Sequence, residues 1–184
     1  AIKDSGKDFI SYLEQDNNSR AALTVFEVIL LGRMKSLGFS VGDDDIKAVS
    51  DIMDFMNISQ YADRNIYELS GGQRQLVFIA QALIKEPSVL ALDEPTSALD
   101  LHRQFRLMEL LKELTVKNGY TTIVTLHHLD MALGFADSVV VIDNNTVYAQ
   151  GSPEEIFTED MMKEIYHINA RIYCDEFGKR HIIP

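Results

Sequence analysis

The chain has 184 residues, of which 46% are apolar and 24% charged, so it has the composition of one globular domain rather than a disordered segment. Its 17 Lys and Arg residues against 28 Asp and Glu residues give a net charge of −11, which is unsuited to wrapping nucleic acid. Cys174 is the single cysteine, so no intrachain disulfide can form, and no apolar run reaches the length of a membrane span.

Helical signals dominate the first half of the sequence. Thr24 and Glu27 have capping-box spacing and the apolar run 25–31 follows Thr24, so a helix is predicted to begin there. The segment 42–45 predicts a second helix start, with its three aspartates solvated at the positive helix end. Apolar residues then recur at helical spacing, and the methionines among them are expected to fill the core: Ile46, Val49, Ile52, Met53 and Met56.

The second half changes to short continuous apolar runs, at 89–92, 121–126 and 138–142. Such runs are typical of strands that are buried on both faces, as in a parallel sheet. Apolar positions from 99 to 114, closed by Gly119, predict a helix between the first two runs, and a shorter helix is expected around 129–135. This alternation of strand and helix predicts an α/β fold.

Smaller elements are expected toward the carboxyl end. Residues 146–149 follow two asparagines and are predicted to pair back as a hairpin. Ser152 has the position of a helix cap, with Pro153 in the first turn and Glu155 answering the cap. Residues 171–184 are expected to form a small hairpin around Gly178.

The stretch Leu69–Gln75 has a composition that a helix alone does not explain. Ser70 and Gln73 have capping-box spacing, which predicts a well-capped helix. Gly71 and Gly72 in the first turn would each cost that helix about 1 kcal/mol. Glycines there allow close backbone approach, so free N–H groups at the positive helix end can face an anion such as a phosphate.

The sequence Leu-Ser-Gly-Gly-Gln at 69–73 resembles the signature motif of the ATP-binding cassette (ABC) ATPases. Four other segments resemble motifs of that family and occur in its order. They are the Q-loop at Tyr12–Gln15, the Walker B strand at Val89–Glu94, the D-loop at Pro95–Asp100 and the switch histidine at His127. The segments 24–33 and 151–156 look most like the importer ATPases for iron-siderophore complexes and vitamin B12.

The resemblance implies roles for residues that would act on a nucleotide in the same subunit. Asp93 would hold Mg²⁺, and Glu94 would be the general base for the attacking water. His127 would contact the γ-phosphate, and Gln15 the metal and the water. The sequence departs from the family beside two of these residues, because Glu14 replaces the usual Pro before Gln15 and His128 replaces the usual Asp after His127.

Other motif residues would act on ATP held by a second subunit. Ser70, Gly71, Gly72 and Gln73 would bind its γ-phosphate, and Asp100 would face the second subunit. The predicted partners are therefore a second ATPase subunit in a head-to-tail homodimer and transmembrane permease subunits, with no nucleic acid. The predicted ligands of the complete subunit are ATP and Mg²⁺.

The P-loop pattern Gly-x-x-x-x-Gly-Lys-Ser/Thr does not occur in the sequence. Lys7 follows a glycine, but Asp8 follows the lysine and Ala1 stands where the first glycine belongs. Without that loop there is no backbone cradle for the phosphates and no hydroxyl on Mg²⁺. The chain alone is therefore expected to bind ATP poorly and to be inactive.

The predicted fold class is α/β, a partial P-loop NTPase (RecA-like) parallel sheet with an inserted helical subdomain. Residues 1–16 are assigned to the Q-loop end of the nucleotide-binding core and residues 17–75 to the helical subdomain that ends in the signature motif. Residues 76–150 are assigned to the α/β core with Walker B, D-loop and switch histidine, and residues 151–184 to a terminal helix and hairpin.

The predicted function is the carboxyl-terminal part of the ATP-hydrolysing subunit of an ABC importer, for iron-siderophore complexes or cobalamin. The subunit would be cytoplasmic and peripheral on the inner face of the cell membrane. One alternative is a naturally truncated, non-catalytic chain that binds partners. Another, ranked last, is a DNA-repair type ABC ATPase, which would carry a long coiled coil between Q-loop and signature.

The segment between Gln15 and Leu69 is predicted to be the surface that docks the permease. Its run 25–31 is more apolar than one amphipathic face requires, so some side chains are expected to form an exposed patch. The rival explanation is a helix buried on all sides within its own domain.

Overall fold

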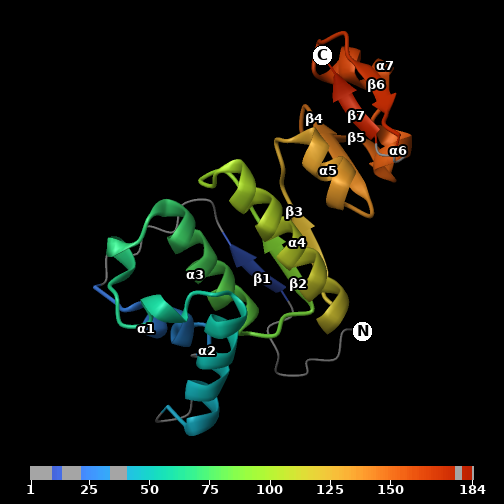
Figure 1. Ribbon diagram of the computed structural model, residues 1–184. Helices are drawn as coiled ribbons and strands as arrows, with labels where there is room; N and C mark the ends of the chain where they lie inside the picture. Colours follow the sequence, from blue (N-terminus) through green and yellow to red (C-terminus); the bar gives the residue numbers. More distant parts are fainter. Residues whose placement is uncertain (1–9, 14–21, 34–40, 177–179, 184) are drawn as a thin grey trace, which may run out of the picture. The chain divides into compact units, whose positions relative to one another are not determined.

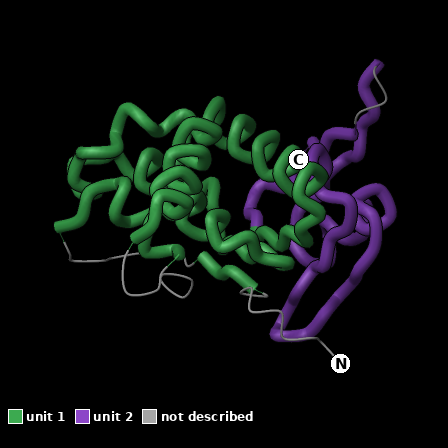
Figure 2. The backbone as a smooth tube through the Cα atoms, turned by 90° about the horizontal axis from the view of Figure 1, so that it is seen from below, with its two compact units in different colours: residues 1–125 green, residues 126–184 purple. Residues whose placement is uncertain are grey.

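The computed structural model describes residues 10–13, 22–33, 41–176 and 180–183 (Figure 1). The chain divides into two compact units, residues 1–125 and 126–184, which Figure 2 colours green and purple. Each unit is considered by itself below.

The first unit combines helices with a three-stranded parallel sheet in the order β1-β2-β3. Its elements in chain order are β1 (Ile10–Leu13), α1 (Val25–Leu31), α2 (Asp43–Phe55), the 3₁₀ helices η1 (Ser59–Tyr61) and η2 (Ile66–Glu68), α3 (Gly71–Leu83), β2 (Val89–Leu92), α4 (Leu101–Asn118) and β3 (Thr121–Val124). The predicted strands at 89–92 and 121–126 are confirmed as β2 and β3, although β3 ends at Val124, and the structure pairs them in parallel. β1 is an addition, because the sequence pattern does not predict it.

One face of this sheet is covered and the other is open. α4 lies along the covered face, where Thr115 Oγ1 and Thr122 Oγ1 are 2.6 Å apart (Figure 1). The buried side chains of that face are Ser11, Leu13, Leu90 and Leu92. The opposite face carries the side chains Ile10, Tyr12 and Ile123, which are 58%, 57% and 56% exposed. The prediction of strands buried on both faces is therefore wrong for β3, because α4 covers a single side.

The helix starts predicted from capping patterns are confirmed. Thr24 caps α1, with its N–H donating to Glu27 Oε2 at 2.8 Å and its Oγ1 accepting from the Glu27 N–H at 3.2 Å. Gly42 precedes α2, and Met53 and Met56 are buried as expected.

Asp45 at the start of α2 is not simply solvated, as the sequence suggested. Its carboxylate accepts from Arg33 Nε at 2.6 Å, and only 14% of its side chain is exposed. This hydrogen bond from Arg33, together with one from the Gly42 N–H, lowers the pKa of Asp45. The pair ties the end of α1 to the start of α2.

The second unit has two antiparallel hairpins and three short helices within its described residues. Its elements are α5 (Leu129–Phe135), β4 (Val139–Asp143), β5 (Thr146–Gly151), α6 (Pro153–Ile156), α7 (Glu159–Ile165), β6 (Arg171–Cys174) and β7 (Arg180–Ile183). Its core is formed by Ala132, Phe157, Met161, Met162 and Ala170. The two predicted hairpins and the Ser152 cap are confirmed, whereas α7 was not predicted and Gly178 lies outside the described residues.

β4 departs from the parallel arrangement that its apolar run predicts. In the described part of the chain it pairs with β5 alone and antiparallel. Val139 and Val141 pack against the core of this unit, whereas Val140 and Ile142 are 51% and 68% exposed. A two-stranded ribbon that packs on one layer buries one face, so alternate residues of an apolar run stay exposed.

No helix among the described residues combines the length and the apolar character that crossing a bilayer requires.

Candidate functional site

The carboxyl ends of the three parallel strands define the candidate site. Asp93 and Glu94 follow β2 directly. The Asp93 N–H donates to Leu13 O at 3.1 Å, and the Thr125 N–H donates to Leu92 O at 3.1 Å. The ladders therefore continue past the strands on both sides of β2, which fixes the backbone where the two predicted carboxylates begin.

Thr125 joins the two predicted site residues through its hydroxyl group. Oγ1 donates to Asp93 Oδ1 at 2.6 Å and accepts from the Glu94 N–H at 2.8 Å. Sequence analysis did not single out Thr125. The available signal was a hydroxyl residue near the carboxyl end of the predicted strand 121–126, whereas Asp93 follows the predicted strand 89–92.

The backbone of Glu94 has a φ of +45°, in the left-handed region that non-glycine residues seldom occupy. The N–H and the hydroxyl of Ser97 both donate to Glu94 O, at 3.1 and 3.0 Å. Thr125 holds the N–H side of the same residue. Such a conformation costs about 1–3 kcal/mol and persists where neighbouring contacts hold it, so these hydrogen bonds set the direction in which the Glu94 side chain leaves the strand.

The predicted D-loop folds against the start of α4. Gln104 Nε2 donates to Thr96 O and to Leu99 O, both at 3.1 Å, and Thr96 is buried. Asp100 caps α4 by accepting from the Arg103 N–H at 3.0 Å, and 62% of its side chain remains exposed. Asp100 thus has a structural role in its own chain and still faces solvent.

The signature segment forms the capped helix start that its sequence predicts. The Ser70 N–H donates to Gln73 Oε1 at 2.9 Å, and the Gln73 N–H donates to Ser70 Oγ at 3.4 Å. Gln73 Nε2 also donates to the Tyr61 hydroxyl at 2.9 Å. Because Ser70 Oγ acts as an acceptor in the cap, its own hydrogen can still be donated to an anion.

The two signature glycines have different surroundings. A Cβ on Gly72 would lie 2.6 Å from Leu99 Cδ2, so this buried glycine permits close packing of α3 on the D-loop. Gly71 is exposed, and a Cβ there would have its nearest neighbour, Ala98 Cβ, at 3.7 Å. Packing explains Gly72, and Gly71 leaves the N–H groups of the first helical turn accessible from outside.

The other two predicted site residues are His127 and Gln15. His127 is exposed and belongs to the second unit, where it precedes α5. Gln15, predicted to contact both metal and water, lies outside the described residues. The first unit therefore brings together Asp93, Glu94 and the D-loop.

The described residues of this site offer Mg²⁺ a single carboxylate ligand. No group of three or more His, Cys, Asp or Glu side chains suited to a metal ion occurs in the described part of the chain. Asp93 offers one carboxylate beside a threonine hydroxyl. A single carboxylate fits Mg²⁺ that is held mainly by water and phosphate oxygens, because this ion seldom uses an all-protein cage.

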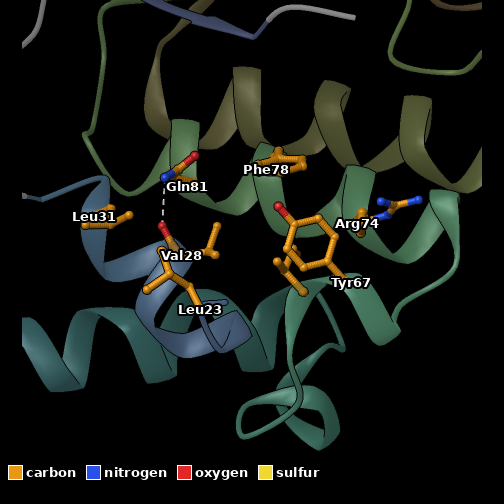
Figure 3. A pocket seen from close by; sticks show the side chains of 8 residues that line it. Leu23, Val28, Leu31, Tyr67, Arg74, Phe78 and Gln81 are labelled. Carbon is orange, nitrogen blue, oxygen red and sulfur yellow. Dashed lines mark hydrogen bonds between the residues drawn. The ribbon is translucent and has the colours of Figure 1, made fainter. Parts of the chain in front are cut away.

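A separate groove of about 220 Å³ lies on the helical part of the first unit (Figure 3). Its lining residues are Leu23, Val28, Leu31, Ile66, Tyr67, Arg74, Phe78 and Gln81. Gln81 Nε2 donates to Val28 O at 2.7 Å, which joins α3 to α1 at the groove. Leu31 is 41% exposed, so the prediction that part of the run 25–31 stays exposed is confirmed, and burial on all sides is wrong.

The described residues place Asp93, Glu94 and the D-loop at the carboxyl edge of a parallel α/β sheet, and comparison with known proteins gives the family. The family model described as "ABC transporter" matches residues 2–97. The chain belongs to this family of ABC transporter ATP-binding proteins.

Individual relatives and solved structures agree with this assignment. The ferric enterobactin transport ATP-binding protein of Escherichia coli is 36% identical over 95% of this chain and 66% of its own length. A metal-chelate type ABC transporter solved in an inward-facing conformation has a TM-score of 0.86 at 27% identity, covering 95% of this chain and 72% of that one. A dimeric ATP-binding cassette bound to ADP and Pi has a TM-score of 0.70 at 30% identity, covering 79% and 63%.

The chain spans 59% to 66% of the length of the curated relatives that it matches, of which the E. coli protein is one, so it corresponds to about three fifths of such a protein. The α/β fold class predicted from the sequence is confirmed by the structural likeness.

The surroundings of the glycines predict unequal effects on stability. Gly72→Ala should lower the free energy of unfolding by about 1–3 kcal/mol, because the new methyl group overlaps buried Leu99. Gly71→Ala, the matched control, should change it by less than about 1 kcal/mol, since the methyl group has room and alanine favours the helix. Urea denaturation measures both values, and equal destabilisation by the two variants would contradict this assignment.

Proposed function

We propose that the chain is the part of an ABC importer's ATP-hydrolysing subunit that carries the signature, Walker B, D-loop and switch motifs. The observation that carries the proposal is the Asp93-Glu94 pair at the carboxyl end of the parallel sheet, in a chain of the ABC family. Ligands bind outside the carboxyl ends of strands in open α/β sheets. The open face with Ile10, Tyr12 and Ile123 further supports a larger whole, since parallel sheets are normally covered on both faces.

The chemistry proposed for the site is attack of water on the γ-phosphate of ATP. Asp93 would hold Mg²⁺, which when bound would neutralise charge on the phosphate oxygens. Glu94 accepts a proton from the attacking water, helped by Gln15, while His127 donates a hydrogen bond to the γ-phosphate.

The second half of the site belongs to a partner's nucleotide. Ser70, Gly71, Gly72 and Gln73 present a hydroxyl, an amide side chain and first-turn N–H groups to the γ-phosphate held by a second copy of the subunit. The exposed side chain of Asp100 faces that second copy. This arrangement requires a head-to-tail dimer.

The proposed cargo is an iron-siderophore complex, with cobalamin as the alternative. The E. coli relative, whose name assigns it to ferric enterobactin transport, supports the first choice. The subunit then works at the inner face of the cell membrane beneath its permease. Uptake of radioactive iron-siderophore in cells that lack and regain the gene tests this choice, and rescue of cobalamin uptake alone would favour the alternative.

The chain alone should have no useful affinity for ATP. Its sequence has no P-loop, so the phosphates lack their cradle, and the signature residues contact a partner's nucleotide. Calorimetry with Mg-ATP should give no saturable heat, with the full-length E. coli relative as the positive control. A micromolar dissociation constant for this chain would contradict the prediction, whereas tight partner binding without ATP would favour the non-catalytic alternative.

In a complete subunit that includes a P-loop, Glu94→Gln should lower turnover by about 10²- to 10⁴-fold. ATP binding should be unchanged, because the substitution removes a base and leaves the phosphate contacts in place. Glu113→Gln on α4 is the matched control, since this glutamate is exposed on a different element. Turnover of the Glu94 variant close to that of the control would exclude Glu94 as the base.

The groove of Figure 3 is the proposed docking site for the permease. Its walls are mostly apolar, with Arg74 and Gln81 as polar groups, which suits an amphipathic segment of a protein partner. Its lining includes Arg74, Phe78 and Gln81 of α3, so its position depends on the helix that begins at the signature residues.

Leu31→Glu should reduce permease binding at least tenfold, because it places a charge on an apolar wall of the groove. Folding should change by less than about 0.5 kcal/mol, since Leu31 is already partly exposed. Val116→Glu is the control, as Val116 is 77% exposed on α4 and does not line the groove. Co-purification with the permease measures the effect, and equal recovery of both variants would overturn the assignment.

A further inference from the structure

We propose that Thr125 is a positioning residue that holds Asp93 and Glu94 in their working arrangement. The inference rests on the proposed function for its catalytic consequence, but its structural part stands on this chain alone. Thr125 is not one of the motif residues and takes no part in the chemistry assigned above.

The backbone of Thr125 is fixed independently of its side chain. Its N–H donates to Leu92 O at 3.1 Å, one residue beyond the paired strands β2 and β3. The hydroxyl therefore starts from a rigid part of the sheet, and its position does not depend on a flexible loop.

The Thr125 hydroxyl acts as a donor to one site residue and as an acceptor from the next. It has one hydrogen, which goes to Asp93 Oδ1 at 2.6 Å, and it has lone pairs, one of which accepts from the Glu94 N–H at 2.8 Å. A single atom thus orients the carboxylate of one residue and the main chain of the next.

The main-chain contact matters because Glu94 has a left-handed conformation, with φ of +45°. An ordinary extended or helical conformation at this position would send the side chain elsewhere. Ser97 holds the carbonyl side of Glu94 and Thr125 holds the N–H side, so losing Thr125 Oγ1 removes the restraint on the N–H side.

Thr125 is exposed, so its methyl group contributes little to packing. Thr125→Val keeps the shape and removes the hydroxyl, and Thr125→Ser keeps the hydroxyl and removes the methyl group. Thr121→Val, at the opposite end of β3, is the matched control because Thr121 is also exposed and lies far along the strand from Asp93.

The first test needs no nucleotide. Amide hydrogen exchange of Glu94 is measured by NMR in this chain and in the three variants. Exchange should be about tenfold faster in Thr125→Val and within about twofold of the parent in Thr125→Ser and Thr121→Val. Unchanged Glu94 exchange in Thr125→Val, with the fold intact by circular dichroism, would overturn the structural part.

The second test measures kcat and KM for ATP in the complete subunit. Thr125→Val should lower kcat by about 10- to 100-fold with KM within about twofold, because hydrogen bonds to charged groups are among the stronger ones. Thr125→Ser should restore most of kcat. A normal kcat in Thr125→Val, or an equal loss in Thr125→Ser, would overturn the inference.

Glu94→Gln in the same assay separates the two proposals. If Glu94→Gln abolishes turnover and Thr125→Val does not, the positioning role fails and the proposed function stands. If Glu94→Gln leaves turnover unchanged, the proposed role of Glu94 fails, whatever Thr125→Val does.

Discussion

The parallel register of β1, β2 and β3 is the constraint on which the candidate site depends. Ile10, Val89 and Thr121 are paired across the sheet, so all three strands end at one level. The hydrogen-bond ladder continues beyond the end of β2, because the Asp93 N–H donates to Leu13 O and the Thr125 N–H donates to Leu92 O. A slip of one residue would turn Leu90 and Leu92 to the open face and separate Asp93 from the Thr125 hydroxyl. Core packing and site geometry are therefore fixed by the same register.

Large apolar side chains are exposed on the open face of this sheet and on one face of β4. Ile10, Tyr12 and Ile123 on the first, and Val140 and Ile142 on the second, are each more than half exposed. Ile123, Val140 and Ile142 belong to apolar runs whose composition suits burial on two sides. The chain spans 63% and 66% of the length of two of its curated relatives.

Local signals in the sequence predicted local structure well. The caps at Thr24, Ser70 and Ser152 each close within three residues, so the pattern and the hydrogen bonds coincide. β1 was missed because it is held by pairing with β2, far along the chain. The hydrogen bonds of Thr125 were missed for the same reason, since they join residues about thirty positions apart. The apolar run 89–92 placed Asp93 and Glu94 directly after a strand, where the structure has them, yet neither the run nor the motif carried information on what holds them.

The signature helix and the Walker B end of the sheet are joined by direct contacts within the first unit. Gly72 packs against Leu99, and Gln104 ties Leu99 O to Thr96 O inside the D-loop. Ser97 in the same loop holds the carbonyl of Glu94. A shift of α3 toward α4 would press on Leu99, because no space for even one methyl group exists at Gly72. The start of the signature helix is therefore joined to the carbonyl of Glu94 through Leu99, the D-loop and Ser97.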